Sequence, residues 1–333
     1  MKKFTFIIFL LGTLKINSQI SDFKHINFTR ADNIAVLNEG ESLNNLPKLV
    51  YQLTYQLPSS VEKFRAIYTW VCMNIRNDYS LAQKIIRNRK KLQNTPEVLH
   101  KWNSSIAKKV LKKLYKQKKT MCTGYAYLIS KMTELVNIES RIINGYGRTI
   151  VSNIDTLEQV NHSWNAIKLN NKWYLCDATW SSGYVNENYS FIKDYNDGYF
   201  LTAPELFAKN HFPSSKKWLL NASQSNTNFT KEPLVYGTAF KHKIIPIKPL
   251  MHSKVIKGSI IHFKLKYLDK TKPESISLIT IKNNNQYKLT LKNLTIKNGY
   301  ISFNYKFNKK GAYDIHLKID SDYIASYVIS SIE

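Results

Sequence analysis

The hydrophobic pattern of this chain changes from helical spacing to alternation, and this change limits the folds open to it. Between about residues 61 and 135, apolar residues recur every three or four positions, as along amphipathic helices. From about residue 141 to 180, and again beyond residue 236, apolar and polar residues alternate, as along half-buried strands. The order predicts an α+β unit, in which helices pack on an antiparallel sheet, followed by an all-β sandwich.

The length of 333 residues is sufficient for two domains, each with its own core. Asn298-Gly299, between two alternating segments, is typical of a tight β-hairpin and supports the sandwich. We expect a signal peptide over 1–19, an approach segment over 20–57, an α+β domain over 58–222, a polar linker over 223–235 and a β-sandwich over 236–333.

Residues 1–19 have the layout of a secretory signal, with two lysines, an apolar run over 4–14 and a polar exit. The apolar run is shorter than the ~20 residues that span a bilayer. We therefore expect a cleaved signal, a secreted or periplasmic location, and no stable membrane insertion.

The formal net charge is +26 and comes mainly from lysines spread along the chain. The excess is accompanied by no nucleic-acid recognition motif, so we expect no nucleic-acid partner. The dense run over 108–119 is interleaved with apolar residues at helical spacing, which predicts the solvated face of an amphipathic helix. The charge also allows attraction to acidic polymers at a cell surface.

The chain has three cysteines, Cys72, Cys122 and Cys176, which do not form the framework of a disulfide-rich exported protein. Cys72 lies on the apolar stripe of a helix that begins after a capping box at Ser59 and Glu62. Cys122 follows a polar, basic stretch and begins another apolar-periodic segment. A cysteine in the first helical turn has a lowered pKa, because it lies at the positive end of the helix dipole.

A second candidate lies in residues 161–177, where two alternating stretches flank Asn170-Asn171. Asparagine tolerates positive φ, so the pair suits a two-residue hairpin turn. Such a turn places Leu169 opposite Lys172 and fixes the register of both strands.

Counting outward from that turn places Trp164 opposite Asp177. His162 shares the face of Trp164, because side chains alternate with period two, and is therefore a diagonal neighbour of Asp177. Diagonal neighbours lie roughly 7–8 Å apart, so a carboxylate to imidazole hydrogen bond is feasible. The same count puts Cys176 on the opposite face and leaves Cys122 as the partner of His162.

Three segments resemble, in order and spacing, the motifs of the transglutaminase-like superfamily: residues 121–126 (MCTGYA), 161–166 (NHSWNA) and 173–180 (WYLCDATW). Residues 67–78 resemble its N-terminal helix, and residues 199–213 resemble the closing segment of the branch that includes the kyphoscoliosis peptidase. The chain departs from the common pattern at Thr120, Met121 and Thr123, around the cysteine, and at Asn77.

The resemblance implies a papain-like α+β core with Cys122, His162 and Asp177 as a catalytic triad. It implies a cysteine enzyme that acts on amide bonds of a protein or peptide substrate through a thioacyl intermediate. We favour peptidase-type hydrolysis over transamidation. The alternative is a catalytically silent surface or binding module that uses this scaffold and an immunoglobulin-like C-terminal sandwich for protein contacts.

Of the aromatic residues near these motifs, Trp164 and Trp180 are expected to form core and the wall of a substrate groove. The histidines His211, His242, His252 and His262 have no metal-ligand spacing. We therefore expect no metal site and no cofactor.

Overall fold

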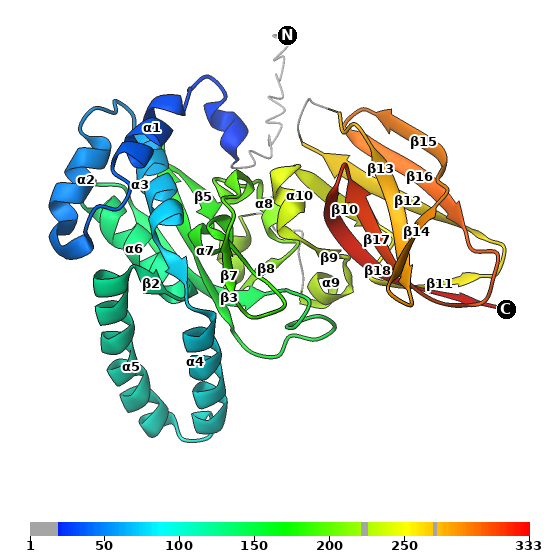
Figure 1. Cartoon of the computed structure of the whole chain (residues 1–333), viewed down its shortest axis with the longest axis horizontal. Helices are drawn as coiled ribbons and strands as arrows, with labels where there is room; N and C mark the ends of the chain where they lie inside the picture. The colour runs from blue at the N-terminus through cyan, green and yellow to red at the C-terminus, as the bar shows by residue number, and fades with distance from the viewer. Residues whose placement is uncertain (1–18, 221–225, 269–271) are drawn as a thin grey trace, which may run out of the picture.

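A computed structural model describes residues 19–220, 226–268 and 272–333, arranged as a mixed helix and sheet unit followed by a β-sandwich (Figure 1). The predicted signal peptide lies almost entirely outside these residues. Among the described residues, no helix is both long enough and apolar enough to span a membrane. The α+β class followed by an all-β region is confirmed.

Residues 20–134 are mainly helical, and they include the segment over 20–57. The capping box predicted at Ser59 and Glu62 is present and starts α3. Arg65 of α3 forms ion pairs with Asp32 of α1 and with Asp197, which fastens the N-terminal helices to the domain. The helices are η1 (Ile20–Phe23), α1 (Thr29–Leu37), η2 (Leu43–Asn45), α2 (Leu46–Thr54), α3 (Ser60–Asn74), α4 (Tyr79–Leu92), α5 (Pro96–Gln117) and α6 (Cys122–Glu134).

The sheet of this unit has four antiparallel strands in the order β5-β4-β3-β8. Both Asn170 and Asn171 have positive φ, and Leu169 pairs with Lys172, so the predicted turn and register are confirmed. The strands are β3 (Ser140–Gly147), β4 (His162–Leu169), β5 (Lys172–Cys176) and β8 (His211–Pro213).

Each face of this sheet is covered. Ile167, Leu169 and Cys176 face the cluster formed with α3 and α6. Trp164 and Leu175 face a second cluster that continues into the C-terminal region. Short elements complete the unit: β1 (Arg76–Asn77), β2 (Lys119–Thr120), α7 (Ala178–Ser181), β6 (Gly183–Val185), β7 (Phe191–Lys193), η3 (Asp197–Tyr199), α8 (Pro204–Phe207) and η4 (Lys216–Leu219).

The C-terminal region packs one sheet, β10-β12-β16-β15, against another, β11-β18-β17-β13-β14. Asn298 and Gly299 both have positive φ between β15 and β16, which confirms that hairpin. The elements are α9 (Asn226–Lys231), β9 (Leu234–Val235), α10 (Gly237–Lys241), β10 (Ile244–Lys248), β11 (His252–Ile256), β12 (Ile260–Tyr267), β13 (Ile276–Lys282), β14 (Asn285–Leu289), β15 (Lys292–Lys297), β16 (Tyr300–Lys306), β17 (Gly311–Ile319) and β18 (Asp322–Ile332).

A buried arginine joins the sheet to the segment that leads into the sandwich. Arg148, one residue after β3, is 1% exposed. Backbone carbonyl groups at the end of a helix need donors, and the guanidinium supplies several at once. Its acceptors are the carbonyl oxygens of Ile154 (3.1 Å), Phe229 (3.1 Å), Thr230 (2.9 Å), Glu232 (2.6 Å) and Pro233 (3.1 Å).

We predict that Arg148→Ala lowers the free energy of unfolding by at least about 3 kcal/mol, because buried carbonyl groups lose their donors. Urea denaturation followed by tryptophan fluorescence measures the loss. The control is Arg141→Ala on β3, where the Arg141 side chain is 54% exposed and paired with Glu139. That exposed pair contributes about 1 kcal/mol or less. Equal losses for the two variants would contradict the prediction.

Candidate active site

Cys122 is the first residue of α6, as predicted, and its thiol is close to His162 and Ser163, the first two residues of β4. The N-cap residue Met121 makes no side-chain hydrogen bond to this helix end, so the first backbone N–H groups remain open to a ligand. Burial alone would raise the pKa of the Cys122 thiol. A hydrogen bond from His162, the charge of His162 and the backbone N–H of Ser163 together lower that pKa below its usual value.

The other two cysteines lie in apolar surroundings. Cys72 on α3 and Cys176 at the end of β5 are at most 1% exposed. Burial raises the pKa of both thiols well above the usual value. All three cysteines are free. Of the three, Cys122 is the one whose surroundings favour the thiolate.

His162 and Asp177 meet as the hairpin register predicts. The distance from His162 Nε2 to Asp177 Oδ2 is 2.7 Å, which leaves Nδ1 of the ring for the sulfur of Cys122. Burial would lower the pKa of His162, but the charge and hydrogen bond of Asp177, followed by those of Cys122, raise it to about 10. The ring is therefore charged at neutral pH and stabilises the neighbouring thiolate.

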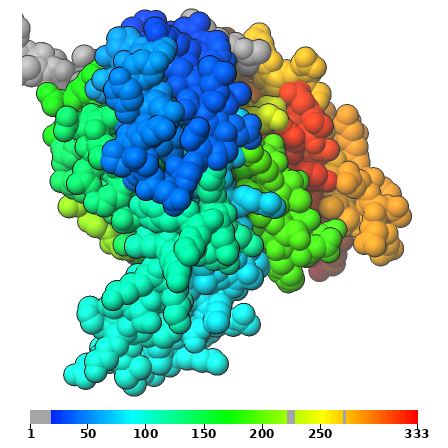
Figure 2. All heavy atoms as spheres, turned by 60° about the vertical axis from the view of Figure 1, so that its left-hand side comes forward, coloured from blue at the N-terminus to red at the C-terminus, as the bar shows by residue number. Residues whose placement is uncertain are grey.

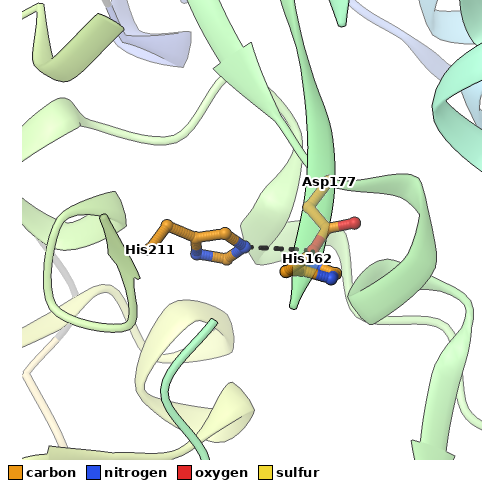
Figure 3. A group of neighbouring side chains, drawn as sticks. All are labelled: His162, Asp177 and His211. Atoms are coloured by element: carbon orange, nitrogen blue, oxygen red, sulfur yellow. Dashed lines mark hydrogen bonds and ion pairs between the residues drawn. The ribbon is translucent and has the colours of Figure 1, made fainter. Parts of the chain in front are cut away.

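His211 is a further member of the site that the sequence analysis did not find. Its Nε2 lies 3.1 Å from the same Oδ2 atom of Asp177, and its Nδ1 lies 2.7 Å from the side-chain oxygen Oδ1 of Asn210. Figure 3 shows the His211 ring pointing at the carboxylate, with His162 beside it. A carboxylate only accepts, so Nε2 of His211 carries a hydrogen.

Burial disfavours the charged form of His211. Its side chain is 0% exposed and stacks on Phe207, with ring centroids 4.0 Å apart. Burial, reinforced by the charge of His162, lowers the pKa of His211 to about 4, although Asp177 opposes the shift. The sequence signal was the segment 211–213, which resembles the closing segment of the family, but nothing local placed it beside Asp177.

Asp177 is fully buried and accepts four hydrogen bonds. Oδ1 accepts from the backbone N–H groups of Thr179 (2.8 Å) and Trp180 (3.3 Å), and Oδ2 faces the two histidines. Burial alone would raise the pKa of Asp177. The charge and hydrogen bond of His162, with those of His211, hold that pKa well below its usual range.

His162, Asp177 and His211 also offer three ligand atoms within 4.8 Å of one another. Two ligand atoms on one tetrahedral zinc ion lie roughly 3.3 Å apart. The 2.7 Å separation between His162 Nε2 and Asp177 Oδ2 is instead that of a charge-assisted hydrogen bond. The arrangement fits a hydrogen-bonded relay and does not fit a metal centre without rearrangement.

The two tryptophans of the predicted groove differ. Trp164 is 1% exposed and packs edge-on against His211, so it belongs to the core beneath the site. Trp180 is half-buried and stacks on His162, with ring centroids 4.6 Å apart. A Cβ on Gly147 would lie 3.0 Å from both His162 and Trp180, so a larger residue there would displace these side chains by a few tenths of an ångström.

Comparison with known proteins agrees with this geometry. Residues 47–178 match the family model of the transglutaminase-like superfamily, so the chain contains a transglutaminase-like domain. The kyphoscoliosis peptidase of Homo sapiens is 31% identical over 192 residues, and that of Mus musculus is 32% identical over 190. Each match covers 56% of this chain and 26% of the relative, so the chain spans about a quarter of their length. A solved Lin-41 filamin domain matches 26% of this chain, and 91% of its own, at 11% identity and a TM-score of 0.21.

We predict that iodoacetamide labels Cys122 faster than Cys72 or Cys176 near neutral pH. The thiolate exists above the lowered pKa of Cys122, and its imidazolium partner persists up to the pKa of His162, about 10. In His162→Ala, burial of Cys122 is opposed less strongly, so the pKa of the thiol rises and labelling at pH 7 falls at least about tenfold.

The measurement is mass-spectrometric mapping of each alkylated cysteine from pH 5 to 9. The acid limb of the Cys122 profile should move to higher pH in His162→Ala. Faster labelling of either buried cysteine, or an unmoved acid limb, would contradict the assignment.

Proposed function

We propose that this domain is a cysteine enzyme that cleaves amide bonds of proteins or peptides, with Cys122, His162 and Asp177 as its catalytic triad. The observation that carries the proposal is the 2.7 Å hydrogen bond between His162 and Asp177, with His162 close enough to the Cys122 thiol at the start of α6 to lower its pKa. The curated relatives bear the name peptidase, which supports hydrolysis over transamidation. The signal-like layout of residues 1–19 supports export, which N-terminal sequencing of protein recovered outside the cell tests.

In the first half-reaction, the Cys122 thiolate attacks the amide carbonyl carbon and the carbonyl oxygen becomes negative. The backbone N–H of Cys122 at the start of α6 donates to this oxygen. The C–N bond then breaks, and the His162 imidazolium gives its proton to the leaving amine. A thioester on Cys122 and a free amine result.

In the second half-reaction, neutral His162 takes a proton from water, and the water oxygen attacks the thioester carbonyl. The C–S bond breaks, the carboxylic acid leaves, and the thiolate and imidazolium are restored. Asp177 keeps its charge throughout, because it orients the imidazole ring and stabilises its protonated form.

The proposal predicts release of fluorescent peptides from fluorescein-labelled casein that exceeds incorporation of dansylcadaverine into dimethylated casein. Both signals should vanish in Cys122→Ala. Asp177→Asn should lower turnover by about 10⁴-fold, because the amide favours the wrong tautomer of His162. Turnover of Asp177→Asn equal to that of the unchanged chain would overturn the triad. Dansylcadaverine incorporation above hydrolysis would overturn the choice of hydrolysis.

We also propose that His211 is a positioning residue that acts through Asp177. Oδ1 of Asp177 is held by backbone N–H groups, whereas Oδ2 receives His162 and His211 together. The second donor fixes the rotation of the carboxylate, so that Oδ2 stays aimed at His162. Phe207 and Asn210 in turn hold the His211 ring.

His211→Phe should keep the fold but lower Cys122 alkylation about tenfold, because a charge-assisted hydrogen bond contributes roughly 1.5–3 kcal/mol. His211→Gln, whose Nε2 amide can replace the imidazole donor, should restore most of the rate. The low-field NMR signal of the proton between His162 and Asp177 should broaden in the Phe variant and sharpen again in the Gln variant. A purely structural role would change the thermal midpoint and leave this signal unchanged.

A further inference from the structure

Positive charge is concentrated in the α4–α5 hairpin, the two helices that project from the body of the domain (Figures 1 and 2). These 36 residues contain eleven Lys or Arg residues and one acidic residue, Glu97, a net charge of +10. The other 297 residues carry the remaining +16 of the total. A lysine-rich composition alone does not explain this local density.

Within the part of the chain that the structure describes, carboxylates neutralise little of this charge. Ten of the eleven basic side chains are exposed. Among the described residues, Lys113 is the member of this set that pairs with a carboxylate, that of Asp78. The hairpin therefore presents a field that attracts polyanions and increases their rate of encounter.

The root of the hairpin, where α4 begins and α5 ends, lies near the thiol of Cys122. Ile85 of α4 and Val110 of α5 share one apolar cluster with Met121 and Cys122. A ligand bound at this end of the hairpin therefore lies near the proposed nucleophile.

A cavity of about 480 Å³ opens at this root, between the hairpin and the β6–β7 turn. Arg76 and Lys119 supply cations to its lining, and the stacked rings of Tyr79 and Tyr189, 5.5 Å apart, supply flat apolar surfaces. Lys119 precedes Cys122 by three residues, so their Cα atoms lie within roughly 11 Å. The volume of the cavity is in the range of small-ligand sites.

The cavity also contains a carboxylate, but that charge is already satisfied. Asp78 is 1% exposed and bonds Lys113, the Ser80 hydroxyl and the Leu81 backbone N–H. It also forms an ion pair with Lys119 at 3.8 Å, so Lys119 would be shared with an incoming carboxylate. Its pKa is lowered, since these hydrogen bonds and Lys119 outweigh burial. Arg76 forms no ion pair among the described residues and can bind a carboxylate through two parallel hydrogen bonds.

We propose that this cavity and the α4–α5 hairpin form a docking site for acidic segments of the polypeptides that Cys122 attacks. The inference rests on the proposed function and adds a substrate class to it. An Asp or Glu side chain enters the cavity and pairs with Arg76 and Lys119, while neighbouring acidic residues lie against the hairpin.

The test uses residues 20–333 with Cys122→Ala, so that the probe is not consumed, and a fluorescein-labelled decapeptide of glutamate. Fluorescence anisotropy should show binding that weakens as salt is raised from 50 to 300 mM, because the charges are screened. Arg76→Gln with Lys119→Gln should weaken binding about tenfold, the effect of two partly enclosed charge pairs. The matched control, Lys288→Gln with Lys292→Gln on exposed edge strands of the sandwich, should bind as the parent does.

Two further probes separate the partner classes. A glutamine decapeptide should not bind, and a 20-base-pair DNA duplex should bind more weakly than the glutamate peptide. Equal affinity for cavity and control variants, or tighter binding of DNA that depends on the same residues, would overturn the proposal. Arg76→Gln alone, which leaves Lys119 beside Asp78, provides a milder variant if the double change lowers the thermal midpoint.

The same variants in a chain that retains Cys122 distinguish this proposal from the enzymatic one. Cys122 alkylation should remain at the parent rate, because neither Arg76 nor Lys119 contacts the triad. Loss of peptide binding with intact alkylation isolates docking. Peptide binding without casein turnover would reject the proposed hydrolysis and, with it, the assignment of the docked peptide as substrate.

Discussion

The buried carboxylate of Asp177 is the constraint on which the rest of the site depends. A carboxylate without partners in an apolar interior costs several kcal/mol, so this one is stable only where donors converge on it. Its four donors come from β4, from β8 and from the first turn of α7. The strand order β5-β4-β3-β8 is what brings these segments together.

Asp177 influences the thiol of Cys122 through the imidazole ring of His162. Asp177 favours the charged form of His162, and charged His162 favours the thiolate of Cys122. Cys122 also lies at the N-terminal end of α6, and the positive end of this helix dipole favours a negative sulfur. Cys122 as a residue is 9% exposed, whereas Asp177 is 0% exposed. The network is thus least exposed at the carboxylate, where the charge must persist.

The contacts that the sequence predicted in this site are those between residues close together along the chain. His162 and Asp177 are joined by a two-residue turn whose asparagines indicate the register, so counting residues was enough. The start of α6 at Cys122 was visible from the change in periodicity. His211 reaches Asp177 because β8 pairs with β3, more than 60 residues earlier, and the sequence carries no local signal for that pairing. Likewise, α1 buries only three residues, too few for a clear apolar stripe.

The packing behind His211 links the site to the C-terminal region. The ring of His211 stacks on Phe207, and Phe207 lies edge-on to Phe240 of α10, with centroids 6.5 Å apart. Phe240 belongs to the apolar cluster that continues into both sheets of the sandwich. Well-packed interiors transmit displacement, since their side chains have little free volume. The second donor to Asp177 is therefore held in place by side chains that the sandwich supports, and the sheet that carries His162 depends on packing from both halves of the chain.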